Sequence, residues 1–402
     1  MKPHSWVALA LALCCLAGPS AARPVQAGGG PGGAAPPPLA RWEQLAATGR
    51  SSRLFAPSDG GLVLQTEAGS VRSVDGGRTW QPLALPVDAD GRALHFRGVA
   101  VHPTDGNVLY VIADESRSRD AAAALYRTGD GGATWNQVLR SSVAIAGWGE
   151  VPLSVISVEV SPADGNVVYA FLNHFGAQYG ALVHSTDSGA TWTQPPPRVQ
   201  SGGSGGSPCG GAYANLHPHS RDPGRLLSLV NLCPAGRQNL AGFALAADAE
   251  YGASGRPSWF PARPGLFPGA VTGGFDPAPA RFYVTAYVPA GGRGALFRTD
   301  DDGTPWRELL AFPSEPANRQ PYLFAVAAVP SDPDRVYVGA DFSGRGGVPR
   351  RGAVRASSDG GATWRDVGGP STDIGEVSRL ALAPGASWLY AGTATGLWRI
   401  AI

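Results

Sequence analysis

The sequence has almost no lysine, few cysteines and little helical pattern. Lys2 is the only lysine among 32 basic residues, so arginine supplies nearly every cation. Glycine (56) and proline (36) are abundant. This composition argues against a mainly helical protein and predicts many short strands joined by tight turns. At 402 residues, the chain holds either two or three average domains or one large all-β domain.

Long apolar runs are also missing. The run WVALALALCCLAG (6–18) is too short for the roughly 20 residues of a membrane helix, and no other stretch reaches that length. Lys2 before it and small residues up to Ala22 or Ala27 after it predict a bacterial export signal over residues 1–27. Leu13 is bulky where a lipoprotein signal needs a small residue, so Cys14 is not expected to carry lipid. The Gly/Pro-rich residues 28–40 are predicted to be a disordered linker.

A strong net charge is absent as well. Cleavage after Ala27 removes Lys2 and Arg23, so 30 basic residues remain against 31 acidic ones. Such a balance offers no general attraction to nucleic acid or to an anionic membrane. We therefore expect neither partner, and the sequence shows no motif for a cofactor or a metal.

What the chain has instead is a repeat. The stretch SSDGGATW (357–364) recurs as SVDGGRTW (73–80), TGDGGATW (128–135), STDSGATW (185–192) and TDDDGTPW (299–306). The tryptophans of these copies are separated by 55, 57, 114 and 58 residues, so one unit has lost its copy, and Trp259 is a displaced remnant. Each unit also carries two apolar strands joined by a Pro/Asp/Gly turn, as in GVAVHPTDGNVLYVIA (98–113). Four antiparallel strands per unit predict an all-β chain folded as a β-propeller.

The two ends of the repeat predict how the ring closes. The last unit, residues 376–400, has only three strands, while RWEQL (41–45) resembles the fourth strand TWQPL (79–83). We expect residues 41–45 to pair with the strand around 397–400, which would remove an open sheet edge. This pairing completes seven blades over residues 41–402.

The repeated motif resembles the Asp-box of the sialidase-type (BNR) propellers. In size the chain is similar to single seven-bladed bacterial propellers of the photosystem II assembly factor and sortilin groups. The resemblance implies a fold and leaves the activity open. The aspartate accepts hydrogen bonds from its own turn, the glycine supplies a rare conformation and the tryptophan packs between blades. Structural roles are thus implied for Asp75, Asp130, Asp187, Asp301, Asp359, Trp80, Trp135, Trp192, Trp306 and Trp364.

Strand alternation puts the Asp-boxes on one face and the loops after each second strand on the other. By analogy with the family, ligands bind on that other face, around the central channel. The second strands end near Glu67, Asp114 and Asp341, which are the candidate catalytic carboxylates if the protein is a hydrolase. Arginine and aromatic groups on this face suit an anionic or sugar-like ligand. The binding candidates are Arg117, Arg119, Tyr179, Arg293, Arg345, Arg350 and Arg351.

Two functional hypotheses remain. The preferred one is an exported, monomeric, non-catalytic propeller that binds a protein or a glycan. The alternative is a glycoside hydrolase with paired carboxylates. TEAG (66–69) and ADFSG (340–344) resemble the setting of one carboxylate in xyloglucan-cleaving enzymes. A sialidase is disfavoured because the Phe/Tyr-Arg-Ile-Pro segment of that family is missing. His217 and His219 could suggest a metal pair, but their place in the repeat favours a turn.

Two cysteines remain after cleavage, and we predict that Cys209 and Cys233 form a disulfide. Both lie in the degenerate unit that lacks the motif, and an isolated pair in an exported chain is most simply bonded. In the chain-entropy model such a loop contributes roughly 3 kcal/mol to stability. Thiol titration of the unreduced mature protein under denaturing conditions should find no free thiol. Two free thiols per chain would show that the prediction is wrong.

Overall fold

The computed structural model describes most of the repeat region. The described residues are 40–46, 51–66, 69–115, 122–145, 147, 149–174, 179–193, 215–232, 240–247, 258–260, 267–275, 281–288, 293–300, 305–312, 320–343, 351–369 and 373–402. The predicted signal (1–27), almost all of the predicted linker (28–40), Cys209 and Cys233 lie outside this part, so those predictions stay open. No described helix is both long and apolar enough to cross a membrane.

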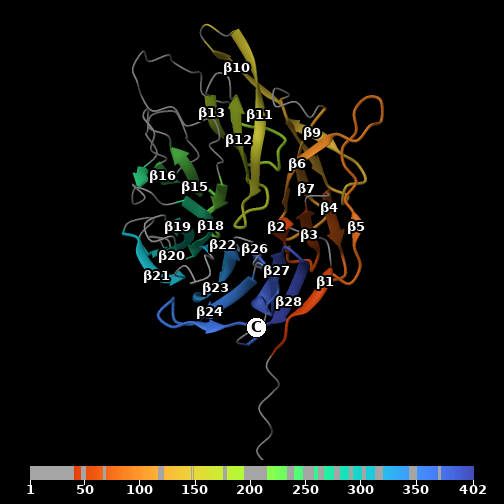
Figure 1. The fold of residues 1–402 in the computed structure, drawn as a ribbon. Coiled ribbons are helices and arrows are strands. Elements are labelled where there is room, and N and C mark those ends of the chain that lie inside the picture. The colour runs from red at the N-terminus through yellow and green to blue at the C-terminus, as the bar shows by residue number, and fades with distance from the viewer. Residues whose placement is uncertain are drawn as a thin grey trace, which may run out of the picture. The chain divides into compact units, whose positions relative to one another are not determined.

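The strands of the described residues form seven four-stranded antiparallel sheets (Figure 1). The first two sheets hold β2 (Ser51–Phe55), β3 (Leu62–Thr66), β4 (Gly69–Ser73), β5 (Gln81–Pro82), and β6 (His95–Val101), β7 (Leu109–Asp114), β8 (Ala124–Thr128), β9 (Asn136–Leu139). The third and fourth hold β10 (Ser141–Ile145), β11 (Gly149–Val160), β12 (Val168–His174), β13 (Tyr179–Ser185), and β14 (Asn215–Pro218), β15 (Arg225–Leu232), β16 (Leu240–Ala247), β17 (Ser258–Phe260).

The remaining sheets follow the same plan. The fifth and sixth hold β18 (Phe267–Phe275), β19 (Arg281–Val288), β20 (Arg293–Thr299), β21 (Arg307–Phe312), and β22 (Gln320–Val329), β23 (Asp332–Ser343), β24 (Arg351–Ser357), β25 (Arg365–Asp366). The seventh joins β26 (Val377–Leu382), β27 (Trp388–Thr393) and β28 (Gly396–Ala401) to β1 (Glu43–Ala46). A 3₁₀ turn, η1 (Pro384–Ala386), connects β26 to β27.

The third sheet departs from the expected plan. The sequence predicted a fourth strand that begins at Trp192, but among the described residues only Thr193 pairs there, with His184. The fourth strand of this sheet is instead β10, which pairs with the first residues of the long strand β11. In the fourth sheet, Trp259 lies within β17, opposite Ala244.

The first strand of each sheet runs along the centre of a ring. These strands are β2, β6, β11, β14, β18, β22 and β26; in the third sheet the strand is β11, because β10 is the added strand. Each contacts the corresponding strand of the next sheet, and β26 contacts β2. The ring is therefore closed within residues 39–402.

The core lies between neighbouring sheets. One cluster joins Tyr110 and Ile112 of the second sheet to Val155 and Leu172 of the third, and others join the sixth sheet to the seventh and the seventh to the first. Because a sheet in the ring has a neighbour on both faces, its second strand is buried on both sides and is mostly apolar. All six residues of β7 (LYVIAD) are buried. This explains why the second strands do not alternate between apolar and polar residues.

The aspartate turns follow the third strand of a unit; this name is used for residues 73–80, 128–135, 185–192 and 357–364. In the turn at Asp75, one carboxylate oxygen accepts the Thr79 amide N–H at 2.9 Å and the other accepts the Thr79 hydroxyl at 2.7 Å. The Ser73 hydroxyl accepts the Gly77 N–H at 2.8 Å, and Gly77 has φ 89°. The other three turns repeat these contacts around Asp130, Asp187 and Asp359. Asp301 lies outside the described residues.

The hydrogen bonds of these turns stabilise the charged carboxylates. Bonds from the Thr191 hydroxyl and N–H and from Ser185 lower the pKa of Asp187 to about 2, and similar bonds lower the pKa of the other three. The tryptophans are half-buried and pack against a neighbouring sheet, as Trp80 does beside Leu45 of β1. Each turn thus supports both its own hairpin and the contact with the next sheet.

The first and last of the described strands, β1 and β28, meet in the seventh sheet. Glu43 pairs with Arg399 and Gln44 with Trp398, which is the pairing expected from the sequence. An ion pair of 2.8 Å joins the Glu43 and Arg399 side chains, and Trp42 Nε1 donates to the Val367 carbonyl at 3.1 Å. β1 therefore covers the edge of β28 and attaches the start of the repeat region to its end.

Deleting residues 28–46 from the mature protein should open this edge. The loss removes the β1 ladder and the Trp42 packing, and about 2 kcal/mol is expected for the tryptophan alone. Thermal unfolding should begin at a lower temperature, and gel filtration should show aggregates that grow with protein concentration. Deleting only residues 28–39 is the matched control and should change neither. A 28–46 deletion variant as stable and monomeric as that control would contradict the role of β1.

Candidate functional site

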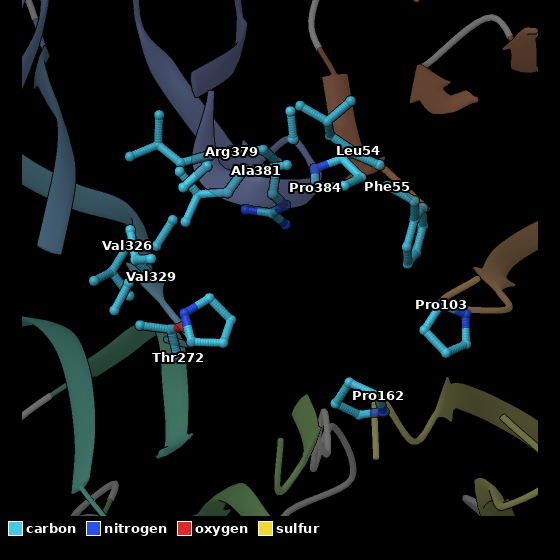
Figure 2. A pocket seen from close by; sticks show the side chains of 18 of the residues that line it. Leu54, Phe55, Pro103, Pro162, Thr272, Val326, Val329, Arg379, Ala381 and Pro384 are labelled. Carbon is cyan, nitrogen blue, oxygen red and sulfur yellow. The ribbon is translucent and has the colours of Figure 1, made fainter. Parts of the chain in front are cut away.

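A cavity lies at the centre of the ring, at the end where the aspartate turns lie. Its volume is about 760 Å³, and all seven sheets contribute to its wall through the innermost strands or the turns that follow them. Figure 2 shows part of this wall, with Pro103 and Pro162 across the hollow from Arg379 and Ala381. Most of the lining is apolar, including Phe55, Val326 and Val329. The name "channel cavity" is used for this space below.

Arg53 of β2 connects three sheets inside the channel cavity. Its guanidinium donates to the Val99 carbonyl of β6 at 2.8 Å and forms an ion pair with Glu159 of β11. Burial, together with the nearby charge of Arg379, lowers the pKa of Arg53 to about 10. Arg53 still carries its charge at neutral pH, with Glu159 as its partner.

Arg379 of β26 supplies the second guanidinium of the channel cavity. Its Nη1 donates to the Ser378 carbonyl at 2.6 Å. β26 lies beside β2 in the ring, so the two arginines come from neighbouring innermost strands. The described lining residues with ionisable groups are Arg53, Arg379, Glu159 and His217.

His217 lies in the channel cavity and not in a turn as predicted. It belongs to β14, opposite Leu227, whereas His219 occupies the turn and accepts the Asp222 N–H at 2.9 Å through Nδ1. His102 and Ser161 accept turn N–H groups at the same place after their strands. The sequence alignment of His217 with His102 was therefore wrong by two residues, and the turn role belongs to His219.

Of the three predicted catalytic carboxylates, the structure describes the side chain of Asp114 alone. Asp114 ends β7 as expected, but its side chain is only 1% exposed and accepts a hydrogen bond from Arg97 Nε. His95 Nδ1 lies 3.8 Å from its other oxygen. Asp341 lies in β23, paired with Tyr322 and Gly352, and its side chain is not among those described. Glu67 lies outside the described residues.

The predicted binding residues fall mostly outside the described part of the chain. Arg293 is described, and its guanidinium forms an ion pair with Glu308 of the same sheet. Tyr179 begins β13 and Arg351 begins β24, but their side chains are not described. Arg117, Arg119, Arg345 and Arg350 lie in segments that the structure does not describe. The expected cluster around the second-strand loops is therefore not tested.

The sequence analysis missed the channel arginines. Their signal is a single charged residue in an innermost strand, as in SSRLF (51–55) and VSRLAL (377–382). Such a position faces the channel because the strand alternates its side chains. The repeat alignment drew attention to the loops, where charged residues are common, and away from these two positions.

Comparisons with known proteins agree with this architecture. No protein-family model matches the chain. The curated xyloglucanase Xgh74A of Acetivibrio thermocellus is 33% identical over 117 residues, which cover 26% of this chain and 14% of that protein. The structure of a GH74 xyloglucanase from Xanthomonas campestris superposes with a TM-score of 0.60 and 19% identity over 90% of this chain. YCF48 bound to a D1 peptide superposes with a TM-score of 0.51 and 17% identity, also over 90%.

The fold is a β-propeller. The chain spans about half (53%) of the Xanthomonas xyloglucanase and 94% of YCF48. At these identities the structural likeness shows the fold alone, so the activity has to be argued from the site.

Replacing His217 by glutamine should make stability less dependent on pH. Burial lowers the pKa of His217 to about 4, and the hydrogen bond to the Gly273 backbone opposes this only in part. An unfolded histidine titrates near pH 6.5, so stability is full above about pH 6.5 and falls as the pH drops towards 4. Each pKa unit corresponds to about 1.4 kcal/mol.

Urea unfolding at pH 7.5 and pH 5.0 checks this. The wild type should lose more unfolding free energy between the two values than His217→Gln, which must first prove folded at pH 7.5. Equal losses would mean that His217 does not carry this dependence.

Proposed function

We propose that the chain is a seven-bladed Asp-box propeller that is exported and works as a non-catalytic binding module. Its partner is a protein or a glycan, held by the loop face opposite the aspartate turns. The seven sheets are its blades, and the four aspartate turns are its Asp-boxes.

The state of Asp114 is the observation that carries this proposal. A glycoside hydrolase needs two carboxyl groups that reach the substrate. The Asp114 carboxylate is buried and bonded to Arg97. Exposing it to a sugar would require breaking an ion pair whose carboxylate is buried, which is costly. Asp114 is therefore a structural residue at the end of β7.

The organisation of the two faces supports the same assignment. The carboxylates of the four described aspartate turns are occupied by their own threonines and serines. The turns on that face have nearly the same sequence, which suits a structural role. The opposite loops differ most between units in length and composition. A neighbour of similar length, YCF48, has a structure with a bound peptide, which fits a propeller that binds rather than cleaves.

Hydrolysis is the second candidate, favoured by the 33% identity to a xyloglucanase over 117 residues. It would require Glu67 and Asp341 as the catalytic carboxylates, because the Asp114 carboxylate is buried and bonded to Arg97. The wild-type protein should release no reducing sugar from xyloglucan or sialosides. Turnover that disappears in Asp341→Asn or Glu67→Gln would replace the binding proposal by this one.

Binding is tested with three arginines that the sequence predicts on the opposite face. Changing Arg345, Arg350 and Arg351 together to alanine should weaken binding to polygalacturonate or poly-glutamate by about tenfold or more, and the difference should shrink as salt rises. Stability should change little, because exposed charges contribute little to it.

The matched control changes Arg78, Arg307 and Arg365, three exposed arginines near the aspartate turns. It removes the same charge from the other face and should bind like the wild type. Calorimetric titration at two salt concentrations measures both variants. Equal weakening in the two triple variants would show only a net-charge effect and would contradict the assigned face.

A further inference from the structure

The innermost strands turn backbone groups towards the channel cavity. In β6 the His102 N–H donates to the Val108 carbonyl at 3.0 Å, and the strand alternates from there, so the backbone of Val99 points away from β7. The Val99 carbonyl accordingly accepts a hydrogen bond from the Arg53 guanidinium at 2.8 Å. Val158 of β11 is turned in the same way, and its carbonyl lies 3.5 Å from the same guanidinium. Arg53 thus supplies donors to two strand edges that face the channel.

The edge of β26 faces the channel in the same way. The Ala383 N–H donates to the Trp388 carbonyl of β27 at 2.9 Å. By alternation, the N–H and C=O groups of Leu380 and Leu382 point away from β27. Both residues line the channel cavity and are half-buried, and no described residue bonds to their channel-facing backbone groups. β26 therefore offers a row of two donors and two acceptors.

Apolar side chains stand on both sides of this edge. Figure 2 shows Leu54 and Phe55 of β2 to one side of Ala381. Val326 and Val329 of β22 lie to its other side. β26 contacts both β2 and β22 in the ring. A strand added along β26 would point its side chains alternately towards these two walls.

The edge and the walls together define the occupant. Water would satisfy the backbone groups of β26 and gain nothing from apolar walls. A hydrocarbon would cover the walls and leave buried amides without partners, which is costly. An extended peptide meets both requirements, because its own N–H and C=O groups alternate with its side chains. Such pairing uses backbone groups alone and leaves Arg53 bonded to Glu159.

We propose that the channel cavity binds a short extended peptide, which pairs as an added strand with β26 at Leu380 and Leu382. Strand addition to an open sheet edge is a general way in which proteins hold peptides. A volume of about 760 Å³ falls in the range of small-ligand pockets and is too small for a folded domain. The site lies at the end of the ring opposite the loop face, so it is a second site beside that of the proposed function.

Calorimetric titration with two uncharged peptides tests the proposal. The first is acetyl-valyl-alanyl-valine amide, and the second carries a methyl group on each of its backbone nitrogens. The first should bind, and the methylated peptide should bind about tenfold or more weakly, because its donors to the β26 carbonyls are lost.

Two variants of the protein test the place of binding. Leu380→Pro removes one channel-facing N–H and no bond to β27, so it should weaken binding of the first peptide, whereas Leu380→Ala keeps that N–H and should weaken it less. Ala381→Trp fills the space beside the edge and should weaken binding about tenfold or more. Ala133→Trp is the matched control and should bind like the wild type. Ala133 is exposed in an aspartate turn, at the position that Arg78 occupies in the first turn.

Several results would overturn the site. These are no binding of the first peptide, equal binding of the methylated one, or an unchanged affinity in an Ala381→Trp variant whose thermal unfolding shows that it is folded. If the variants of β26 fail to fold, the comparison of the two peptides on the wild type decides. Propylbenzene is titrated in parallel, and binding as tight as that of the peptide would overturn the peptide occupant.

The two proposed sites are separated by the loop-face triple variant. It should bind the first peptide normally, and Ala381→Trp should bind polygalacturonate or poly-glutamate normally. Loss of the peptide in the triple variant would place the peptide on the loop face and overturn the channel site. Failure of one site is therefore distinguishable from failure of the other.

Discussion

Each sheet of this protein has two apolar faces, and a sheet in isolation would leave both of them in water. The buried strand β7 shows the constraint most clearly, since none of its six residues is left for solvent. Only a ring in which every sheet has two neighbours covers all these faces. The stability of one sheet therefore depends on the presence of the others, and on the pairing of β1 with β28 that completes the last one.

Polar contacts between sheets follow the same repeat. Tyr110 donates to the Ser188 carbonyl of the next aspartate turn at 3.0 Å, and Tyr283 donates to the Pro333 carbonyl at 2.8 Å. Arg298 reaches the Gly360 carbonyl of the following turn at 2.8 Å. These long side chains start in the apolar interface and satisfy backbone carbonyls at its edge. An aspartate turn is thus an acceptor for the sheet before it as well as a support for its own hairpin.

The fold was predictable from the sequence because its signals are local and repeated. Turn residues, apolar strands and the spacing of the tryptophans occur in nearly every unit. The closing pair was predictable for the same reason, since residues 41–45 resemble a fourth strand. The strand order of the third sheet was not predictable. Its strand β10 lies outside the repeated pattern and forms a hairpin with β11 that the other units lack.

The site was harder to predict than the fold. Its charged groups, Arg53, Glu159 and Arg379, come from three different units and meet only because the ring brings their strands together. No spacing along the chain encodes that meeting. His217 shows a related limit, because a shift of two residues moves a side chain from the turn to the channel without changing the apolar pattern. Asp114 ends its strand as expected, yet its burial beside Arg97 depends on packing that the sequence pattern does not reveal.

The pairing of β1 with β28 also affects when the ring can close during synthesis of the chain. Among the described strands, β1 is the first to be synthesised and its partner β28 is the last. The ring cannot close until β28 has been made, and contacts so distant in sequence form slowly. A chain interrupted before β28 keeps an unpaired edge at β1 and an uncovered sheet face beside it. A repeat region that includes β28 thus differs from a shorter one in whether the edge of β1 is paired.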